Sequence, residues 1–176
     1  MNIKSLIRTV PHFPKQGIMF RDITPLLASG PGFRHVIERM AERYAGRVDK
    51  VVAIEARGFI FGAAIAQQIG AGFVPVRKPG KLPAASRGHD YQLEYGTNRV
   101  EVHVDGLASG ERVVVVDDLL ATGGTALAAL SLVEQSGANV VECAFLIELT
   151  DLPGRRRLQE RGHGVHALCG FSEDES

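Results

Sequence analysis

Apolar and polar residues follow one another along the chain in blocks that predict strands separated by helices. Short apolar runs rich in valine and isoleucine predict buried strands at residues 51–55, 73–77, 112–117 and 140–149. Strands that are apolar throughout, with helices between them, are typical of a parallel sheet covered on both faces. We therefore expect an α/β fold with a central, mostly parallel sheet and helices on both faces.

Helices are predicted where the apolar spacing changes to three and four. In residues 33–44 the apolar positions fall on one helical face and the charged residues lie outside it. A mostly apolar helix follows Arg57 and ends at Gly70, and another spans residues 123–137. Val100, Val102 and Val104 alternate with polar residues and predict a half-exposed strand at residues 99–104. A weak helix and a strand near residues 165–169 complete the predicted elements.

Two stretches interrupt this pattern. After a short helix within residues 2–10, the proline- and glycine-rich residues 11–30 are predicted to form an ordered but irregular lead-in. Residues 78–98 are polar and broken by proline and glycine, and a structureless stretch of this length is often a functional lid. No repeat or linker divides the chain. We expect a single domain over residues 1–176, with a small hood at about 1–30 and a long flexible lid loop at about 78–98.

Composition and charge argue against several classes of protein. The 176-residue chain carries 20 Lys and Arg against 20 Asp and Glu, a neutral balance that argues against a nucleic-acid binder. No apolar run reaches the roughly 18 residues of a membrane span, and the first residues lack the apolar stretch of a signal peptide. Cys143 and Cys169 lie in apolar contexts and favour a reducing compartment. We therefore expect a cytoplasmic protein without nucleic-acid or membrane partners.

The most informative segment is VVVVDDLLATGGT at residues 113–125. A buried strand ends in two carboxylates, Asp117 and Asp118, and a glycine-rich turn then opens a helix. In open α/β sheets ligands bind beyond the carboxyl ends of the strands, and a helix N-terminus favours a phosphate there. Backbone amides and two hydroxyls for such an anion come from Ala121, Thr122, Gly123, Gly124 and Thr125. Carboxylates beside a phosphate cradle suit the hydroxyls of a sugar, so the segment predicts a ribose 5-phosphate site.

An ordinary strand–loop–helix turn, with aspartate as N-cap and glycine for tightness, is the alternative interpretation. It is favoured for the TGGT run taken alone and disfavoured for residues 113–125 as a whole. A Walker A loop is excluded because no Gly-Lys-Ser/Thr follows, and the chain contains no GxGxxG fingerprint.

The same segment resembles the phosphoribosyl-pyrophosphate signature of type I phosphoribosyltransferases. Further stretches in order over residues 10–152 resemble adenine phosphoribosyltransferases in particular: FRDITPLL (20–27), EARGFIFG (55–62), RKPGKLP (77–83), LEYG (93–96) and LIELT (146–150). The resemblance implies purine salvage, in which the 5-phosphoribosyl group of phosphoribosyl pyrophosphate is transferred to adenine to give AMP and pyrophosphate. It also implies the type I phosphoribosyltransferase fold, a homodimer, and Mg²⁺ carried by the substrate pyrophosphate rather than by a protein metal site.

The resemblance implies that two loops bind pyrophosphate. The first follows the strand at 51–55, so Arg57 is expected at the same sheet edge as Asp117. The second is the basic run RKPGK, whose cations would stabilise the charge that develops on a departing pyrophosphate. The residues implied are Glu55, Ala56, Arg57, Gly58, Arg77, Lys78 and Lys81. A surface arginine at a helix start and a solvated charged loop are the alternatives.

The lid ends in LEYG, where the resemblance implies that Glu94 is the general acid/base at the imidazole ring of adenine. Adenine loses a proton as its N9 bonds to C1′ of the ribose, so a carboxylate within hydrogen-bond reach is chemically sensible. Tyr95 is implied to order the lid, whose closure excludes water from the activated sugar. Together with Arg57 these are the candidate catalytic residues, and an exposed loop glutamate is the alternative for Glu94.

The resemblance implies that adenine binds between the lead-in segment and the end of the strand at 140–149. Met19, Phe20, Arg21 and Leu149 would enclose the purine, with backbone groups at Arg21 at its Watson–Crick edge. A carbonyl and N–H pair suits the 6-amino group and N1 of adenine and rejects 6-oxopurines. The alternative is that these side chains are simply core residues.

Two other functions stay open from the residues alone. One is a phosphoribosyltransferase for xanthine, hypoxanthine/guanine or orotate. The other is a non-catalytic regulator that senses phosphoribosyl pyrophosphate and binds nucleic acid. The histidines lack metal-ligand spacing, the basic run at 155–157 predicts a solvated helix face, and no role is predicted for Arg87, His89 and Asp90.

Overall fold

A five-stranded sheet forms the centre of the computed structural model, which describes residues 1–92, 96–172 and 175. The strand order is β4-β3-β7-β8-β9, and every adjacent pair is parallel. The strands are β3 (Lys50–Ile54), β4 (Gly72–Val76), β7 (Arg112–Leu120), β8 (Asn139–Leu149) and β9 (Val165–Phe171). This arrangement confirms the predicted parallel sheet.

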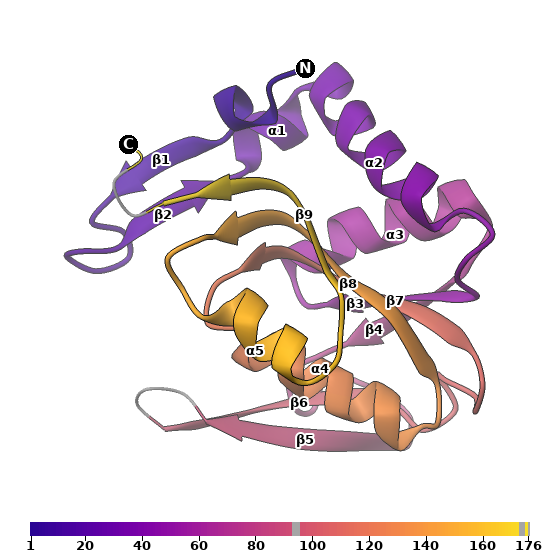
Figure 1. The fold of residues 1–176 in the computed structure, drawn as a ribbon. Helices are drawn as coiled ribbons and strands as arrows, with labels where there is room; N and C mark the ends of the chain where they lie inside the picture. The colour runs from indigo at the N-terminus through magenta and orange to yellow at the C-terminus, as the bar shows by residue number, and fades with distance from the viewer. Residues whose placement is uncertain (93–95, 173–174, 176) are drawn as a thin grey trace.

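Helices cover both faces of the sheet, as predicted (Figure 1). α2 (Gly30–Tyr44) and α3 (Arg57–Ile69) pack on one face, whereas α4 (Gly124–Gln135) and the short α5 (Gly154–Glu160) lie on the other. None of the helices among the described residues is long and apolar enough to cross a membrane.

The apolar run of β7 supplies both layers of the core. Val113 and Val115 belong to the core beneath α4, and Val114 and Val116 belong to the core beneath α2 and α3. All four are fully buried. A strand with a helical layer on each side needs apolar residues in both directions, which explains why this stretch reads as a continuous run rather than an alternation.

Local signals set the helix and strand limits. The Ser29 side chain accepts a hydrogen bond from the Gly32 amide at 3.2 Å and caps the start of α2. Gly70 ends α3 with a φ of 70°, the left-handed conformation that glycine adopts without steric cost. Pro75 lies in β4, an edge strand of the sheet, where its missing amide is tolerated.

The N-terminal segment contains more secondary structure than predicted. A 3₁₀ helix, η1, covers only Ile3–Leu6, and β1 (Arg8–Pro11) follows it. β1 pairs antiparallel with β2 (Met19–Asp22), and α1 (Thr24–Ala28) comes next. The predicted helix within residues 2–10 is wrong after Leu6, where the chain forms β1 instead. The polarity pattern of these residues does not indicate that they pair with β2.

A second hairpin lies within the predicted lid. β5 (Ser86–Gln92) pairs antiparallel with β6 (Thr97–His103) and packs against α4. The prediction that residues 78–98 are structureless throughout is therefore wrong. Val100 and Val102 of β6 are buried in the core beneath α4 and anchor the hairpin, while β5 is polar and half-exposed along its length.

Candidate active site

The predicted sugar-phosphate segment lies at the carboxyl end of β7. The strand continues to Leu120, three residues past the end predicted at 117, and the following turn leads into α4. Gly123 is the N-cap of α4 with a φ of 81°, and no side chain caps this helix. All five residues of the turn, 121–125, line a cavity of about 100 Å³. The turn therefore has the position and the open helix terminus that a phosphate requires.

The N-terminus of α5 supports this turn from behind. The Gly154 amide donates to the Ala121 carbonyl at 3.0 Å, and Arg157 Nη1 donates to the Thr122 carbonyl at 2.6 Å. A Cβ placed on Gly154 would lie only 2.3 Å from the Ala121 oxygen. Only glycine at this position allows the helix and the turn to approach so closely.

The contacts of α5 correct the prediction of a solvated face at 155–157. Arg155 Nε donates to Glu148 Oε1 at 2.7 Å, and Arg157 binds the turn as described. Arg156 fits the prediction, because its side chain is 75% exposed and its ion pair with Glu160 is long at 3.8 Å. Arg157 is also exposed, but it has a partner in the turn.

A larger cavity of about 360 Å³ adjoins the turn and shares Asp117, Leu119 and Thr125 with the smaller one. Residues predicted to bind pyrophosphate line it: Glu55, Ala56, Arg57, Arg77 and Lys78. Asp118 also lines this cavity. The β5–β6 hairpin contributes one wall, formed by Tyr91, Asn98 and Val100. The structure therefore brings the predicted sugar and pyrophosphate residues to one crevice at the carboxyl edge of the sheet.

Burial and mutual repulsion govern the two carboxyl groups in this crevice. Removal from water raises the pKa of Asp117, and the neighbouring charge of Asp118 raises it further. Burial also raises the pKa of Asp118, while the Arg57 guanidinium, with Nε 3.0 Å from Asp118 Oδ2, opposes that rise. Such carboxyl groups are stabilised by hydrogen-bond donors, and the hydroxyls of a ribose would provide them.

Glu55 holds the basic loop in place. Its carboxylate oxygens accept hydrogen bonds from Arg77 Nη2 at 3.0 Å, from Arg77 Nε at 3.2 Å and from the Lys78 amide at 3.0 Å. The hydrogen bonds from Arg77 lower the pKa of Glu55. An ionised Glu55 would repel pyrophosphate, so it is unsuited to contact that anion. Its hydrogen bonds indicate instead that it positions Arg77.

Two other residues predicted for pyrophosphate do not line the cavity. Gly58 packs beneath it, where an added Cβ would lie 2.9 Å from Asp117 Oδ1 and 3.0 Å from the Val116 carbonyl. Lys81 is exposed, and its carbonyl accepts a hydrogen bond from Arg77 Nη1 at 3.1 Å.

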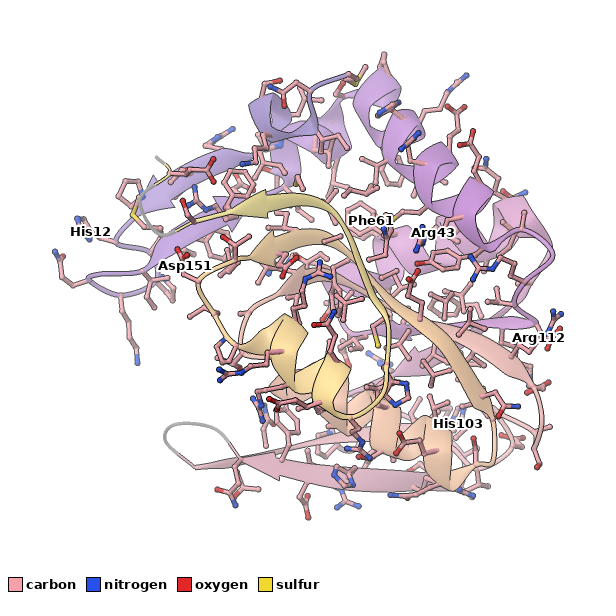
Figure 2. All side chains as sticks on the ribbon, in the orientation of Figure 1. His12, Arg43, Phe61, His103, Arg112 and Asp151 are labelled. Carbon is pink, nitrogen blue, oxygen red and sulfur yellow. The ribbon has the colours of Figure 1, made fainter. Side chains whose placement is uncertain are left out.

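A third cavity, of about 290 Å³, lies beside the β1–β2 hairpin and is mostly apolar. Met19, Arg21 and Leu149, predicted to enclose adenine, line it. The sequence prediction missed the remaining lining residues: Gly17, Ile18, Asp151, Leu152, Phe171 and Ser172. Figure 2 shows Asp151 at the end of the molecule that also carries His12, opposite to Arg112.

Phe20 does not line this cavity. Its ring packs edge-to-face on Phe13, with centroids 5.1 Å apart, and lies 5.3 Å from the Arg57 guanidinium carbon. Phe20 thus connects the hairpin to the arginine of the crevice, a cation–π contact that the sequence did not indicate.

The Arg21 side chain fastens the C-terminal segment to the hairpin. It is 2% exposed, and it donates to Thr9 Oγ1, to the Ser172 carbonyl at 3.1 Å and to the Glu175 carbonyl at 2.7 Å. Its guanidinium also lies 4.3 Å from the centre of the Phe171 ring. These contacts explain how Phe171 and Ser172 come to form a wall of the third cavity.

Glu94 and Tyr95, the two predicted catalytic residues of the lid, lie outside the described residues. In the sequence they fall between β5 and β6, and Tyr91, Asn98 and Val100 of these two strands line the crevice. Among the described residues, no group of three or more His, Cys, Asp or Glu side chains is placed to hold a metal ion. Cys143 and Cys169 are free thiols, and burial raises their pKa values to about 12 and about 11.

The chain belongs to the phosphoribosyl transferase family, whose domain model matches residues 22–163. It is 58% identical to the adenine phosphoribosyltransferase of Methylobacillus flagellatus, over 99% of this chain and 100% of that relative. The crystal structure of adenine phosphoribosyltransferase from Thermoanaerobacter pseudethanolicus is 51% identical and superposes with a TM-score of 0.92, over 96% of this chain and 98% of that one. Within the family the chain is therefore one of the adenine phosphoribosyltransferases, which confirms the resemblance and the fold expected from the motifs.

Proposed function

We propose that the chain transfers the 5-phosphoribosyl group of phosphoribosyl pyrophosphate to adenine, forming AMP and pyrophosphate, with the crevice and the third cavity as its active site. The observation that carries the proposal is the single crevice in which an open glycine–threonine turn, an acid pair and a group of cations meet. The Saccharomyces cerevisiae adenine phosphoribosyltransferase, 38% identical with a TM-score of 0.89 over 94% of this chain and 96% of that one, was crystallised with adenine and an imino-altritol bisphosphate.

The donor substrate is assigned to the crevice. The turn from Ala121 to Thr125 takes the 5′-phosphate through its amides and hydroxyls, and Asp117 and Asp118 accept hydrogen bonds from the ribose hydroxyls. Arg57, with the amides around Ala56, and the basic loop take the pyrophosphate. In that loop Arg77 and Lys78 lie at the cavity, Glu55 holds Arg77, and Lys81 lies nearby.

Mg²⁺ fits this donor set, because hard cations prefer oxygen ligands and Mg²⁺ keeps several waters. The phosphoribosyltransferase family is generally dependent on Mg²⁺. We assign the ion to the pyrophosphate of the substrate, where it would neutralise part of the leaving-group charge, with Asp117 and Asp118 close by. A homodimer and a cytoplasmic location stay predictions.

Adenine is assigned to the third cavity, with Met19 and Leu149 at its faces and the backbone of Arg21 at its Watson–Crick edge. Phe20 supports the hairpin rather than the base. The C1′–O bond to pyrophosphate loosens first, and the positive charge that develops on the sugar is stabilised by the adjacent carboxylates. Adenine N9 then bonds to C1′ from the opposite face, Glu94 accepts the purine proton, and Tyr95 helps the lid to exclude water.

A purine panel tests this function. The purified chain is incubated with Mg²⁺, phosphoribosyl pyrophosphate and one base at a time: adenine, hypoxanthine, guanine or xanthine. We expect AMP from adenine, with release of pyrophosphate, and no nucleotide from the 6-oxopurines. Nucleotide formed from a 6-oxopurine, or none from any base, would overturn the proposal.

A further inference from the structure

We infer that Tyr91 is a positioning residue for the 5′-phosphate of phosphoribosyl pyrophosphate, acting through the hydroxyl of Thr125. The inference rests on the proposed function, because it takes the turn at 121–125 as the phosphate site. Tyr91 lies on β5 and lines the central crevice. Its phenol oxygen lies 3.1 Å from Thr125 Oγ1, which makes it a hydrogen-bond partner of the turn from a different part of the chain.

The ring of Tyr91 is held in place independently of its hydroxyl. The ring packs against the core beneath α4, and a Cβ placed on Gly124 would lie 3.4 Å from Tyr91 Cδ2, so little space separates the ring from the turn. Elsewhere the hairpin is fixed by the buried Val100 and Val102 and by Arg87, whose Nη1 donates to the Gln135 carbonyl at 2.9 Å. Removal of the phenol oxygen alone therefore leaves the hairpin on α4.

The chemistry of two adjacent hydroxyls explains what Tyr91 adds. A hydroxyl has one proton to donate and two lone pairs, so a hydroxyl pair can reverse its direction. In the structure Thr125 donates to Tyr91. When a phosphate occupies the turn, the Thr125 proton points to a phosphate oxygen, and Tyr91 donates to the lone pair that Thr125 then offers.

This relay strengthens the contact to the phosphate. Hydrogen bonds in a chain polarise one another, so Thr125 becomes a better donor when it accepts a bond from a phenol. The relay also fixes the Thr125 rotamer that meets the anion. Tyr91 precedes Glu94, the proposed acid/base group, by three residues in the sequence, so β5 contacts the phosphate turn shortly before the chain reaches that group.

The test is a double-mutant cycle with Tyr91→Phe, Thr125→Val and the double variant. KM values for phosphoribosyl pyrophosphate and adenine, kcat, and the Kd for phosphoribosyl pyrophosphate by calorimetry are measured for each. We expect Tyr91→Phe to raise the KM and Kd for phosphoribosyl pyrophosphate about 3- to 10-fold, the usual effect of one hydrogen bond, with the adenine KM unchanged. The double variant should bind it no more weakly than Thr125→Val alone.

Tyr44→Phe is the matched control, because the Tyr44 hydroxyl is bonded to Glu142 Oε2 at 2.7 Å and lies away from the crevice. We expect it to lower the melting temperature and leave the KM for phosphoribosyl pyrophosphate unchanged. An unchanged KM and Kd in Tyr91→Phe, equal rises in both KM values, or additive losses in the cycle would overturn the inference. Absence of AMP formation by the unmodified chain would overturn the proposed function instead.

Discussion

The acid pair shows at the scale of single residues how a binding site opposes stability. Asp118 is 4% exposed and Asp117 lies beside it, so two carboxyl groups that are largely removed from water share one crevice. Arg57 forms an ion pair with Asp118, and its charge offsets only part of the rise in the pKa of Asp117. The folded chain therefore retains protons that an unfolded chain would release, and ionisation of the pair at neutral pH destabilises the fold.

The Asp117→Asn variant tests whether ionisation of the acid pair destabilises the fold. The raised pKa of Asp117 means that stability falls as pH increases from the ordinary aspartate value, about 4, up to the raised value. We expect the variant to melt at a higher temperature than the parent at pH 7–8, by roughly 2–4 °C per kcal/mol recovered. The difference should vanish near pH 3, where the carboxyl group is protonated in both states. Thermal melts from pH 3 to 8 measure it.

Asp49→Asn is the opposite control, because hydrogen bonds from Arg112 lower the pKa of Asp49 to about 2. This exposed pair stabilises the fold above the ordinary pKa of aspartate and loses that effect as pH falls toward 2. The Asp49 variant should therefore melt slightly lower than the parent at neutral pH. Equal or lower melting of Asp117→Asn at pH 7–8 would contradict the account of the acid pair.

The proposed role of Glu94 is a second prediction at this scale. Glu94→Gln keeps the size of the side chain and removes its ability to take a proton, so kcat should fall about 100-fold or more while both KM values change little. Steady-state kinetics with adenine and phosphoribosyl pyrophosphate measure the split. A loss confined to KM would show that Glu94 contributes binding and not proton transfer.

At the scale of elements, α5 is the part of the site that the sequence pattern concealed. Arg155 and Arg157 belong to a charge run of the kind that is usually solvated, and their partners lie in β8 and in the phosphate turn. Apolar runs predicted β3, β7 and β8 because a strand buried on both faces leaves an unbroken signal. The valine alternation predicted most of β6, whereas β1, β2 and β5 were missed because they are short or polar and largely half-exposed, so that neither an apolar run nor a clear alternation indicates them.

The contribution of the hydrogen bond between Arg157 and the Thr122 carbonyl can be tested by comparing variants of Arg157 and Arg156. Arg157→Met removes the hydrogen bond to the Thr122 carbonyl, so we expect a KM for phosphoribosyl pyrophosphate about 2- to 5-fold higher and an unchanged adenine KM. Arg156→Met removes only an exposed pair with Glu160, and its kinetics should match the parent. Steady-state kinetics of the two variants make the comparison. Similar increases in the KM for phosphoribosyl pyrophosphate in both variants would mean that the charge of α5, and not the hydrogen bond from Arg157, affects binding.

Across the whole molecule, the N-terminal β1–β2 hairpin and the end of β9 lie side by side and both line the third cavity (Figure 1). Arg21 of the N-terminal hairpin holds the Ser172 carbonyl, and Lys4 Nζ lies 2.7 Å from Glu175 Oε1. The motifs placed Arg57, Asp117 and Asp118 at one edge of the sheet, because these residues closely follow apolar strands. They did not predict Phe171 and Ser172, because no local pattern indicates that a strand end will pack on a hairpin 150 residues earlier.

Deletion of residues 172–176 tests how much the C-terminal residues contribute to adenine binding in the third cavity. The shortened chain loses Ser172 from the cavity wall and two carbonyl acceptors from Arg21, so we expect a severalfold higher adenine KM. The KM for phosphoribosyl pyrophosphate should not change, because the crevice lies on other elements. Lys4→Met is the control, because it removes the ion pair with Glu175 and the cation over the Phe171 ring but leaves Ser172 and both carbonyl acceptors of Arg21 in place. Equal rises in both KM values would indicate general loosening of the fold.

Gly58 allows the start of α3 to rest directly on Asp117, so the tips of β3 and β7 form one tightly packed block. The third cavity, to which we assign adenine, lies outside that block and is formed by the β1–β2 hairpin, the end of β8 with the segment after it, and Phe171 and Ser172. The preference for one acceptor base can therefore change through substitutions in these peripheral segments. The residues at the tips of β3 and β7, which are proposed to bind the sugar phosphate, need not change with them.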